Sequence, residues 1–141
     1  MSRRFKEQFK RIEQILSPRF SDISRRLETL EYYKQFLERQ LKFPIEVTGR
    51  EDFSWEEFYV LGPGDKREYE MLKRTRASYT DMLRMTGFSA HCEADYGLFA
   101  YLTRISDKKR FELPLGDFKA VDKKSAAYQL LEDYSVWIVN Y

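Results

Sequence analysis

The sequence is poor in the residues that build disulfide bonds and metal centres. It contains one cysteine, Cys92, and one histidine, His91. A single cysteine excludes a disulfide within the chain and favours a reducing, cytoplasmic location. A structural zinc site normally needs four Cys or His ligands, and adjacent side chains in a loop usually point apart. Neither a zinc site nor a Cys–His catalytic pair is therefore predicted.

Long apolar runs and the motifs of common enzymes are missing as well. No segment approaches the roughly 18 consecutive apolar residues of a membrane span, so no membrane partner is expected. The charged segment 2–14 lacks the apolar stretch of a secretory signal. The sequence has no P-loop, dinucleotide fingerprint or nucleophile elbow. Its adjacent acids, Glu56–Glu57 and Glu132–Asp133, are expected to be solvated or to cap helices, so the chain is predicted not to be an enzyme.

Aromatic side chains are abundant, with 11 Phe, 10 Tyr and 2 Trp among 141 residues. A chain of this length can bury a core without disulfides or metals, and it predicts one domain, alone or with an appendage. The net charge is only +2, but residues 1–40 hold ten Lys or Arg against six Asp or Glu, and the rest holds fifteen against seventeen. This contrast predicts a basic helical part, residues 1–41, and a separate domain, residues 42–141.

The N-terminal part has the apolar spacing of two helices, residues 3–16 and about 18–40, separated at Pro18. In the second helix a heptad-like seam is interrupted only by Lys34. Two arrangements of this seam stay open: a helical hairpin packed on the rest of the chain, or a coiled coil between two copies. The seam residues expected to carry a contact with a partner are Phe20, Ile23, Leu27, Leu30 and Leu37.

Residues 50–78 are predicted to form a helical insertion. Ser54 and the acid three residues later match a capping box, which favours a short helix to Tyr59 or Leu61, with a strand as the alternative. The Gly62-Pro63-Gly64 triplet breaks this element. A second helix is expected from Lys66 to about Ala77, with Asp65 as its N-cap.

The remaining pattern is that of short strands. They are expected at 42–48, 79–85, 96–105, 110–114, 118–121 and 134–140, with a turn at Gly87-Phe88, a polar loop at 89–95 and a short helix at 124–133. Pro44 donates no hydrogen bond to a ladder, which favours an edge position for the first strand. The predicted fold is α+β, with an N-terminal helical hairpin followed by a small, strongly bent β-barrel that carries the helical insertion.

Several motifs resemble those of a family of small bacterial calcium-binding proteins first known from cyanobacteria. The resemblance covers about residues 41–141. It lies in Leu41-Lys42-Phe43-Pro44-Ile45-Glu46, in Tyr96-Gly97 at the start of a long strand, in Pro114-Leu115 with Phe118 and Val121, and in Asp133-Tyr134-Ser135-Val136-Trp137. It implies a barrel of the Src-homology-3-like type.

The same resemblance implies Ca²⁺ as the one candidate cofactor, held by surface carboxylates. Calcium takes six to eight oxygen ligands, several of them from carboxylates. The acids in matching places are Glu93 and Asp95, in the loop before the long strand, and Glu46 on the first strand.

The primary functional hypothesis is a non-enzymatic interaction or regulatory module. The helices and the insertion would form the surface for a protein partner or for a second copy of the chain. One alternative is a calcium-binding regulatory protein that uses the loop carboxylates. A second is nucleic-acid binding, since basic side chains of the N-terminal helices can neutralise phosphates. The residues named for that role are Arg3, Arg4, Lys10, Arg11, Arg25 and Arg26.

Overall fold

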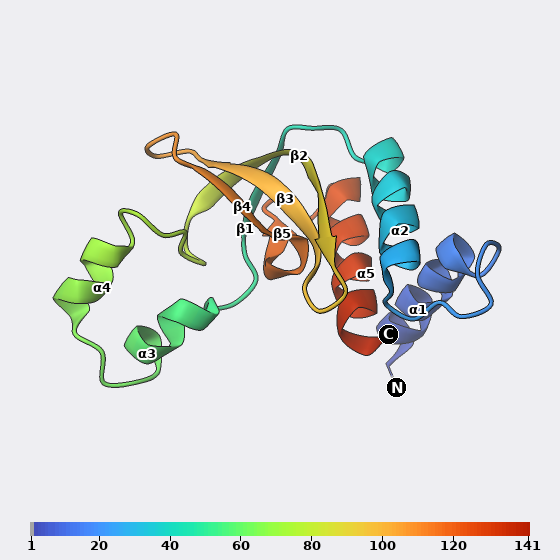
Figure 1. Cartoon of the computed structure of the whole chain (residues 1–141), viewed down its shortest axis with the longest axis horizontal. Helices are drawn as coiled ribbons and strands as arrows, with labels where there is room; N and C mark the ends of the chain where they lie inside the picture. The colour runs from blue at the N-terminus through green and yellow to red at the C-terminus, as the bar shows by residue number, and fades with distance from the viewer. Residues whose placement is uncertain (1) are drawn as a thin grey trace.

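The structure is a computed structural model that describes residues 2–141, and it combines helices with a single sheet (Figure 1). The elements run in the order α1 (Arg3–Leu16), α2 (Leu27–Gln40), β1 (Ile45–Gly49), η1 (Ser54–Glu56), α3 (Glu57–Val60), α4 (Lys66–Leu72), β2 (Met82–Glu93), β3 (Gly97–Arg104), β4 (Arg110–Pro114), η2 (Leu115–Asp117), β5 (Phe118–Ala120) and α5 (Ala126–Asn140), where η denotes a short 3-10 helix. The α+β fold class predicted from the sequence is confirmed.

The five strands form one antiparallel sheet in the order β4-β3-β2-β1-β5. β4 and β5 lie at its two edges, and no ladder joins them within residues 2–141, so the predicted small, strongly bent β-barrel is not confirmed. β1 lies between β2 and β5, and the predicted edge position of this strand is wrong. Pro44 precedes the first paired residue, Ile45, so its missing N–H interrupts no ladder.

β2 is one long strand where the sequence predicts a strand, a turn and a polar loop. It runs through Gly87-Phe88 and pairs with β3 as far as Glu93. Two register shifts interrupt the pairing, between Met85 and Gly87 and between Phe88 and Cys92. Bulges of this kind bend a strand without ending it, and they explain why the alternation of apolar side chains breaks where the backbone continues.

The C-terminal residues form a single helix, α5, and the predicted final strand at 134–140 is wrong. The helix begins at an N-cap, Ser125, whose hydroxyl accepts a hydrogen bond from Tyr128 N. Its buried apolar residues, Leu131, Tyr134, Trp137 and Ile138, recur at the spacing of one helical face. Burial of that face outweighs the strand preference of the aromatic and β-branched side chains.

The other helices differ from their predicted bounds at the ends. α1 matches, but α2 begins at Leu27 instead of near Pro18, because Thr29 caps it by accepting from Arg26 N and donating to Ser24 O. The short helix after residue 53 is confirmed. Its cap is different from the predicted Ser54: the Glu56 carboxylate accepts from Phe53 N. α4 is capped by Asp65 as predicted and ends at Leu72.

Helices α1, α2 and α5 gather on one side of the sheet, and the core lies between them and the strands (Figure 1). An aromatic cluster of Tyr33, Tyr134 and Trp137 occupies its centre. Leu30 and Leu37 of the predicted partner seam are fully buried in this core. Within residues 2–141, no helix combines the length and the apolar character that crossing a membrane requires.

Replacing Trp137 with alanine tests the role of α5. We expect the free energy of unfolding to fall by about 3–5 kcal/mol, because a large side chain with no exposed surface leaves a cavity. Val139 lies on the same helix and is exposed, so Val139→Ala should change stability by less than about 0.5 kcal/mol. Urea unfolding followed by circular dichroism measures both, and equal effects would contradict the assignment.

Candidate functional site

Residues 50–81, here called the arm, connect β1 to β2 and carry η1, α3 and α4 (Figure 1). The two ends of the arm are joined at the sheet. Gly49 N donates to Tyr79 O at 3.0 Å, and the Thr48 hydroxyl donates to Asp81 O at 2.9 Å. The arm therefore leaves the sheet and returns to it at one place, and its position depends on contacts near that root.

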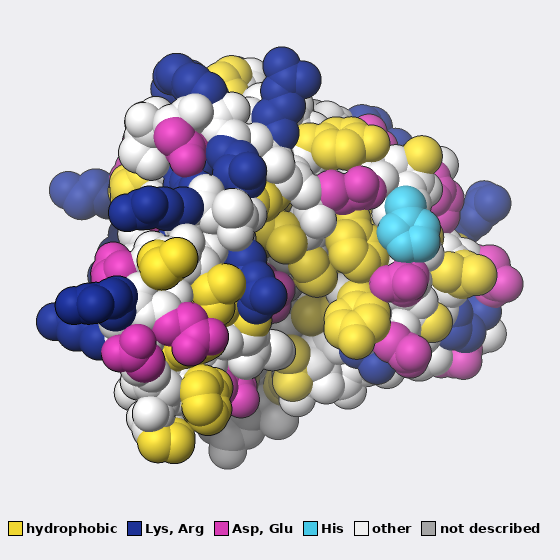
Figure 2. All heavy atoms as spheres, turned by 60° about the vertical axis from the view of Figure 1, so that its left-hand side comes forward, with side chains coloured by type: hydrophobic (Ala, Val, Ile, Leu, Met, Phe, Trp, Pro, Cys, Tyr) yellow, Lys and Arg dark blue, Asp and Glu magenta, His cyan; other side chains and the backbone are white. Residues whose placement is uncertain are grey.

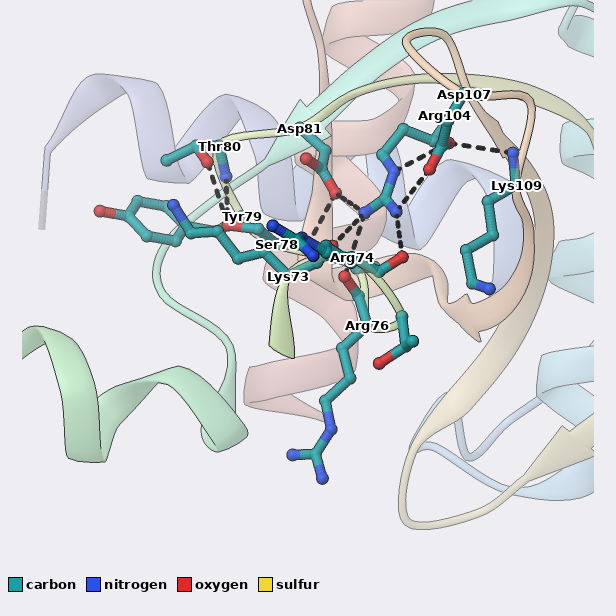
Figure 3. A network of polar contacts seen from close by, with 12 residues as sticks. Lys73, Arg74, Arg76, Ser78, Tyr79, Thr80, Asp81, Arg104, Asp107 and Lys109 are labelled. Carbon is teal, nitrogen blue, oxygen red and sulfur yellow. Dashed lines mark hydrogen bonds and ion pairs between the residues drawn. The ribbon is translucent and has the colours of Figure 1, made fainter. Parts of the chain in front are cut away.

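Arg104 on β3 is the main contact between the arm and the sheet (Figure 3). Its buried guanidinium donates to the carbonyl oxygens of Lys73, Arg74 and Arg76 at 2.9–3.0 Å. These carbonyls follow the last turn of α4, where backbone acceptors lack helical partners. One side chain thus holds the returning half of the arm.

Two carboxylates balance the charge of Arg104. It donates to Asp81 at 3.0 Å and to both oxygens of Asp107, at 3.0 and 2.9 Å. The hydrogen bonds from Arg104 lower the pKa of Asp107 to about 2, and the hydrogen bond to Asp107 raises the pKa of Arg104. Arg104, Asp81 and Asp107 are therefore all paired. Their contacts have a structural role, and none of the three is free to act in catalysis.

Glu56 organises the inside of the arm in a similar way. Its fully buried carboxylate accepts from the Tyr69 hydroxyl at 2.6 Å, the Ser78 hydroxyl at 2.7 Å and Tyr79 N at 2.9 Å. Burial, together with the hydrogen bond to Glu56, raises the pKa of Tyr69 to about 12. Four donors including Phe53 N saturate this carboxylate, so it fixes the arm and is not a free base.

A groove of about 810 Å³ lies between the arm, β4, η2, the β2–β3 turn and α5. Its floor is largely apolar and aromatic, and includes Phe53, Trp55, Tyr96, Phe111, Leu113 and Val139. In Figure 2 hydrophobic side chains gather at the centre of this face, between a surface rich in Lys and Arg and a more acidic one. Pockets of this size and lining are typical of binding sites.

A smaller polar hollow of about 150 Å³ adjoins the groove where the arm leaves the sheet. Four acids line it: Glu51, Asp52, Glu57 and Asp117. Within residues 2–141, none of their side chains makes a hydrogen bond or an ion pair. The nearby Arg50 guanidinium is occupied by Glu132 and by the carbonyls of Gly116 and Phe118.

The electrostatics of the hollow are unfavourable for the carboxylate of Asp117. Burial, and next the negative charge of Glu51, raise the pKa of Asp117, although Arg50 opposes this shift. A raised carboxyl pKa means that the ionised form is disfavoured where it stands. A bound cation would relieve that cost. Sequence patterns do not reveal this grouping, because Asp117 lies far along the chain from Glu51, Asp52 and Glu57 and shares no motif with them.

Of the acids predicted from the sequence to bind calcium, Glu46 lies apart from Glu93 and Asp95. Glu46 pairs with Arg84 near the start of β2, whereas Glu93 lies at the end of β2 opposite Gly97. Glu93 is 3.6 Å from the ring of His91, and Asp95 borders the groove. In the part of the chain that the structure describes, no three Asp, Glu, His or Cys side chains form a ready-made metal cluster.

Most of the basic residues named for nucleic-acid binding are engaged within the chain. Arg11 forms a two-point pair with Asp133 at 2.7 and 2.9 Å, and Arg25 donates to Ile138 O at 2.8 Å. The other contacts are Arg3 with Glu7, Arg4 with Glu132, and Arg26 with Asp22 and Glu28; Lys10 makes none within residues 2–141. Most of these side chains therefore make contacts within or between the helices. Their binding to phosphate stays a prediction.

The fold has counterparts among solved structures. No protein-family model matches the chain, and no curated protein sequence does. The crystal structure of Anabaena CcbP matches with a TM-score of 0.61 and 14% sequence identity, covering 94% of this chain and 89% of that one. A structure described as a calcium-binding protein in the calcium-binding form matches with a TM-score of 0.60 and 16% identity, covering 99% and 96%.

These matches confirm, at the level of the fold, the resemblance to small calcium-binding proteins that the motifs indicated. They also extend it, because their coverage reaches beyond residues 41–141 into the N-terminal helices.

Replacing Arg104 with glutamine should release the arm. We expect stability to fall by about 3 kcal/mol, since Asp81 would keep its charge without its partner. Amide hydrogen exchange at residues 73–81 should rise more than elsewhere. Arg110 lies on the same hairpin, is exposed and makes no ion pair in residues 2–141, so Arg110→Gln is the matched control. Unchanged exchange in Arg104→Gln would contradict the role given to this side chain.

Proposed function

We propose that the chain is a non-enzymatic, calcium-binding regulatory protein, and that the polar hollow at the root of the arm holds the ion. The observation that supports this most is the group of four carboxylates around the hollow, Glu51, Asp52, Glu57 and Asp117, none with a hydrogen-bonding partner in residues 2–141. The two matching structures agree with this chemistry, since one is described as a calcium-binding protein in its calcium-binding form.

The donor set suits Ca²⁺ better than a transition metal. All four acids offer hard oxygen ligands, Ser54 adds a hydroxyl, and neither His91 nor Cys92 lines the hollow. The carboxylates are not gathered into a cluster beforehand, so binding has to draw them together. That cost predicts a modest affinity, with a dissociation constant on the order of 10⁻⁴ M or weaker.

The position of the hollow gives calcium a regulatory effect. Asp117 belongs to η2, whereas Glu51, Asp52 and Glu57 belong to the arm. An ion shared by these residues would connect the arm to the body of the protein at a second point, in addition to Arg104. Calcium would therefore stiffen the arm and the groove beside it.

Calorimetric titration with Ca²⁺ tests this proposal. Asp117→Asn and Glu51→Gln should each weaken binding by about tenfold, because fewer charged ligands lower calcium affinity. Glu112 is exposed on β4 and does not line the hollow, so Glu112→Gln is the control. Because the pKa of Asp117 is raised, protons compete with the ion for its carboxylate, and lowering the pH should weaken calcium binding.

Variants of the acids predicted from the sequence show whether calcium binds at those acids instead of in the hollow. If calcium binding is lost in a Glu93→Gln, Asp95→Asn double variant and kept in Asp117→Asn, the ion lies at the β2–β3 turn and not in the hollow. Glu46→Gln, on β1 beside the start of β2, tests the third predicted ligand separately from both. No binding heat and no rise in melting temperature in any form would remove the calcium proposal.

Self-association is a second candidate, carried by the apolar side chains around α3 and α4. Phe58 and Leu61, at α3, and Met71, on α4, are 55%, 78% and 59% exposed, which is unusual for large apolar residues. The predicted partner seam on α2 offers less, because of its members only Leu27 is largely exposed. The insertion is thus a better surface for a second copy than the helix seam.

Light scattering after size exclusion separates these two surfaces. We expect a mass that rises with concentration in the unmodified chain and a monomer in the Phe58→Ser, Leu61→Ser double variant. Leu27→Ser should behave as the unmodified chain. A loss of association in Leu27→Ser alone would return the contact to α2, and a monomer at the highest soluble concentration would exclude both.

A further inference from the structure

We propose that the groove binds a small amphipathic monoanion, such as an aliphatic or aromatic carboxylate, with its anionic group on Arg76 and its apolar body along the floor. The groove adjoins the polar hollow and shares Glu51 and Asp117 with it, but the contact with Arg76 does not depend on calcium. It extends the function from ion binding to recognition of an organic ligand.

The floor is suited to an apolar body. The residues that line the groove come from the arm, β4 and α5, and most are aromatic or aliphatic. Two of them, Tyr96 and Val139, remain 62% and 78% exposed, so the fold itself does not use their apolar surface. A ligand that covers them would bury surface that is otherwise in contact with water.

Arg76 is held in place as an anion receptor. Its guanidinium lies over the Trp55 ring, 5.4 Å from the centroid, and the Trp55 indole is itself fixed by donating to Ala77 O at 2.8 Å. The carbonyl of Arg76 accepts from Arg104 at 3.0 Å, which anchors the backbone. In Figure 3 the side chain of Arg76 points away from that network.

In residues 2–141 the guanidinium of Arg76 makes no hydrogen bond and no ion pair, which sets it apart from the other arginines of the groove. Arg25 donates to the carbonyl of Ile138, and Arg50 is occupied by Glu132 and two carbonyls. A planar guanidinium that is stacked on an aromatic ring and unpaired is a suitable two-point donor for a carboxylate or sulfonate.

The acids around the groove determine how much negative charge a ligand can carry. Asp95 comes from the β2–β3 turn, Asp117 from η2 and Glu51 from the root of the arm, and all three border the same groove. Their carboxylates would repel a second anionic group. The groove therefore favours a single anionic head beside the returning half of the arm, with the apolar remainder of the ligand extending toward α5.

Two dyes with the same rings isolate the role of Arg76. The anion 8-anilinonaphthalene-1-sulfonate carries a sulfonate, and N-phenyl-1-naphthylamine lacks it. In a buffer containing EDTA, we expect fluorescence titration to show both dyes binding. Arg76→Gln should raise the dissociation constant of the anion by about tenfold, since one charge-assisted contact is lost, and leave that of the neutral dye nearly unchanged.

Arg74→Gln is the matched control, because Arg74 is also exposed and also gives its carbonyl to Arg104, but it does not line the groove. Val139→Asp changes an exposed residue of the floor without disturbing the core, and it should weaken binding of both dyes. Equal affinities of the anion for the Arg76→Gln and Arg74→Gln variants, or unchanged affinities in Val139→Asp, would overturn the proposal.

A final pair of measurements identifies the source of the anion. Decanoate below its micellar concentration should displace the anionic dye from the unmodified chain. Vesicles of phosphatidylcholine and phosphatidylglycerol should not carry the chain into the pellet. Co-sedimentation that is lost in Arg76→Gln would show that the group recognised is a lipid headgroup at a membrane surface and would overturn the free-ligand assignment.

Discussion

The buried face of α5 is the constraint on which the other elements depend. Tyr134 accepts a hydrogen bond from Leu98 N at 2.9 Å, and Trp137 donates to Ile23 O at 2.8 Å. One helix is therefore tied to the sheet through β3 and to the N-terminal helices through the loop between α1 and α2. Arg11 adds an ion pair from α1 to Asp133. Without α5, α1 would lose its principal contact with the rest of the molecule.

The arm is held by a different kind of interaction. Its attachment depends on two buried ionic groups, Arg104 and Glu56, whose hydrogen bonds are directional and fully used. The body, in contrast, is held by close-packed apolar side chains. The groove and the polar hollow both lie between the arm, which polar contacts hold, and the body, which apolar packing holds. A segment fixed by a few polar contacts opens more easily than a packed core, and this is the usual condition for a site that responds to a ligand.

The sequence revealed local features well and distant ones poorly. α1, the capped helix α4 and the β3–β4 hairpin follow from spacing and turn chemistry within a few residues. Two quoted motifs also have a physical explanation: Gly97 has a positive φ of 82°, and the space beside it is filled by the Tyr134 hydroxyl. The motif at Gly97 and the motif at Tyr134 contact each other in the folded chain.

The features that failed, or left no signal, depend on contacts made after folding. The last residues look like a strand until burial selects one helical face, and β2 looks interrupted because its bulges disturb the alternation. The four acids of the hollow become neighbours only when η2 packs beside the root of the arm.

The way the arm joins the sheet also bears on how such a protein can diversify. Because the chain departs after Gly49 and returns at Tyr79, with a hydrogen bond between the two, the ladder of β1 and β2 is complete without anything beyond that point. The arm between these two points can therefore be replaced without changing the pairing of β1 with β2. Related chains could lengthen, shorten or exchange it while keeping the same scaffold, and each exchange would give the neighbouring groove a new wall and a new specificity.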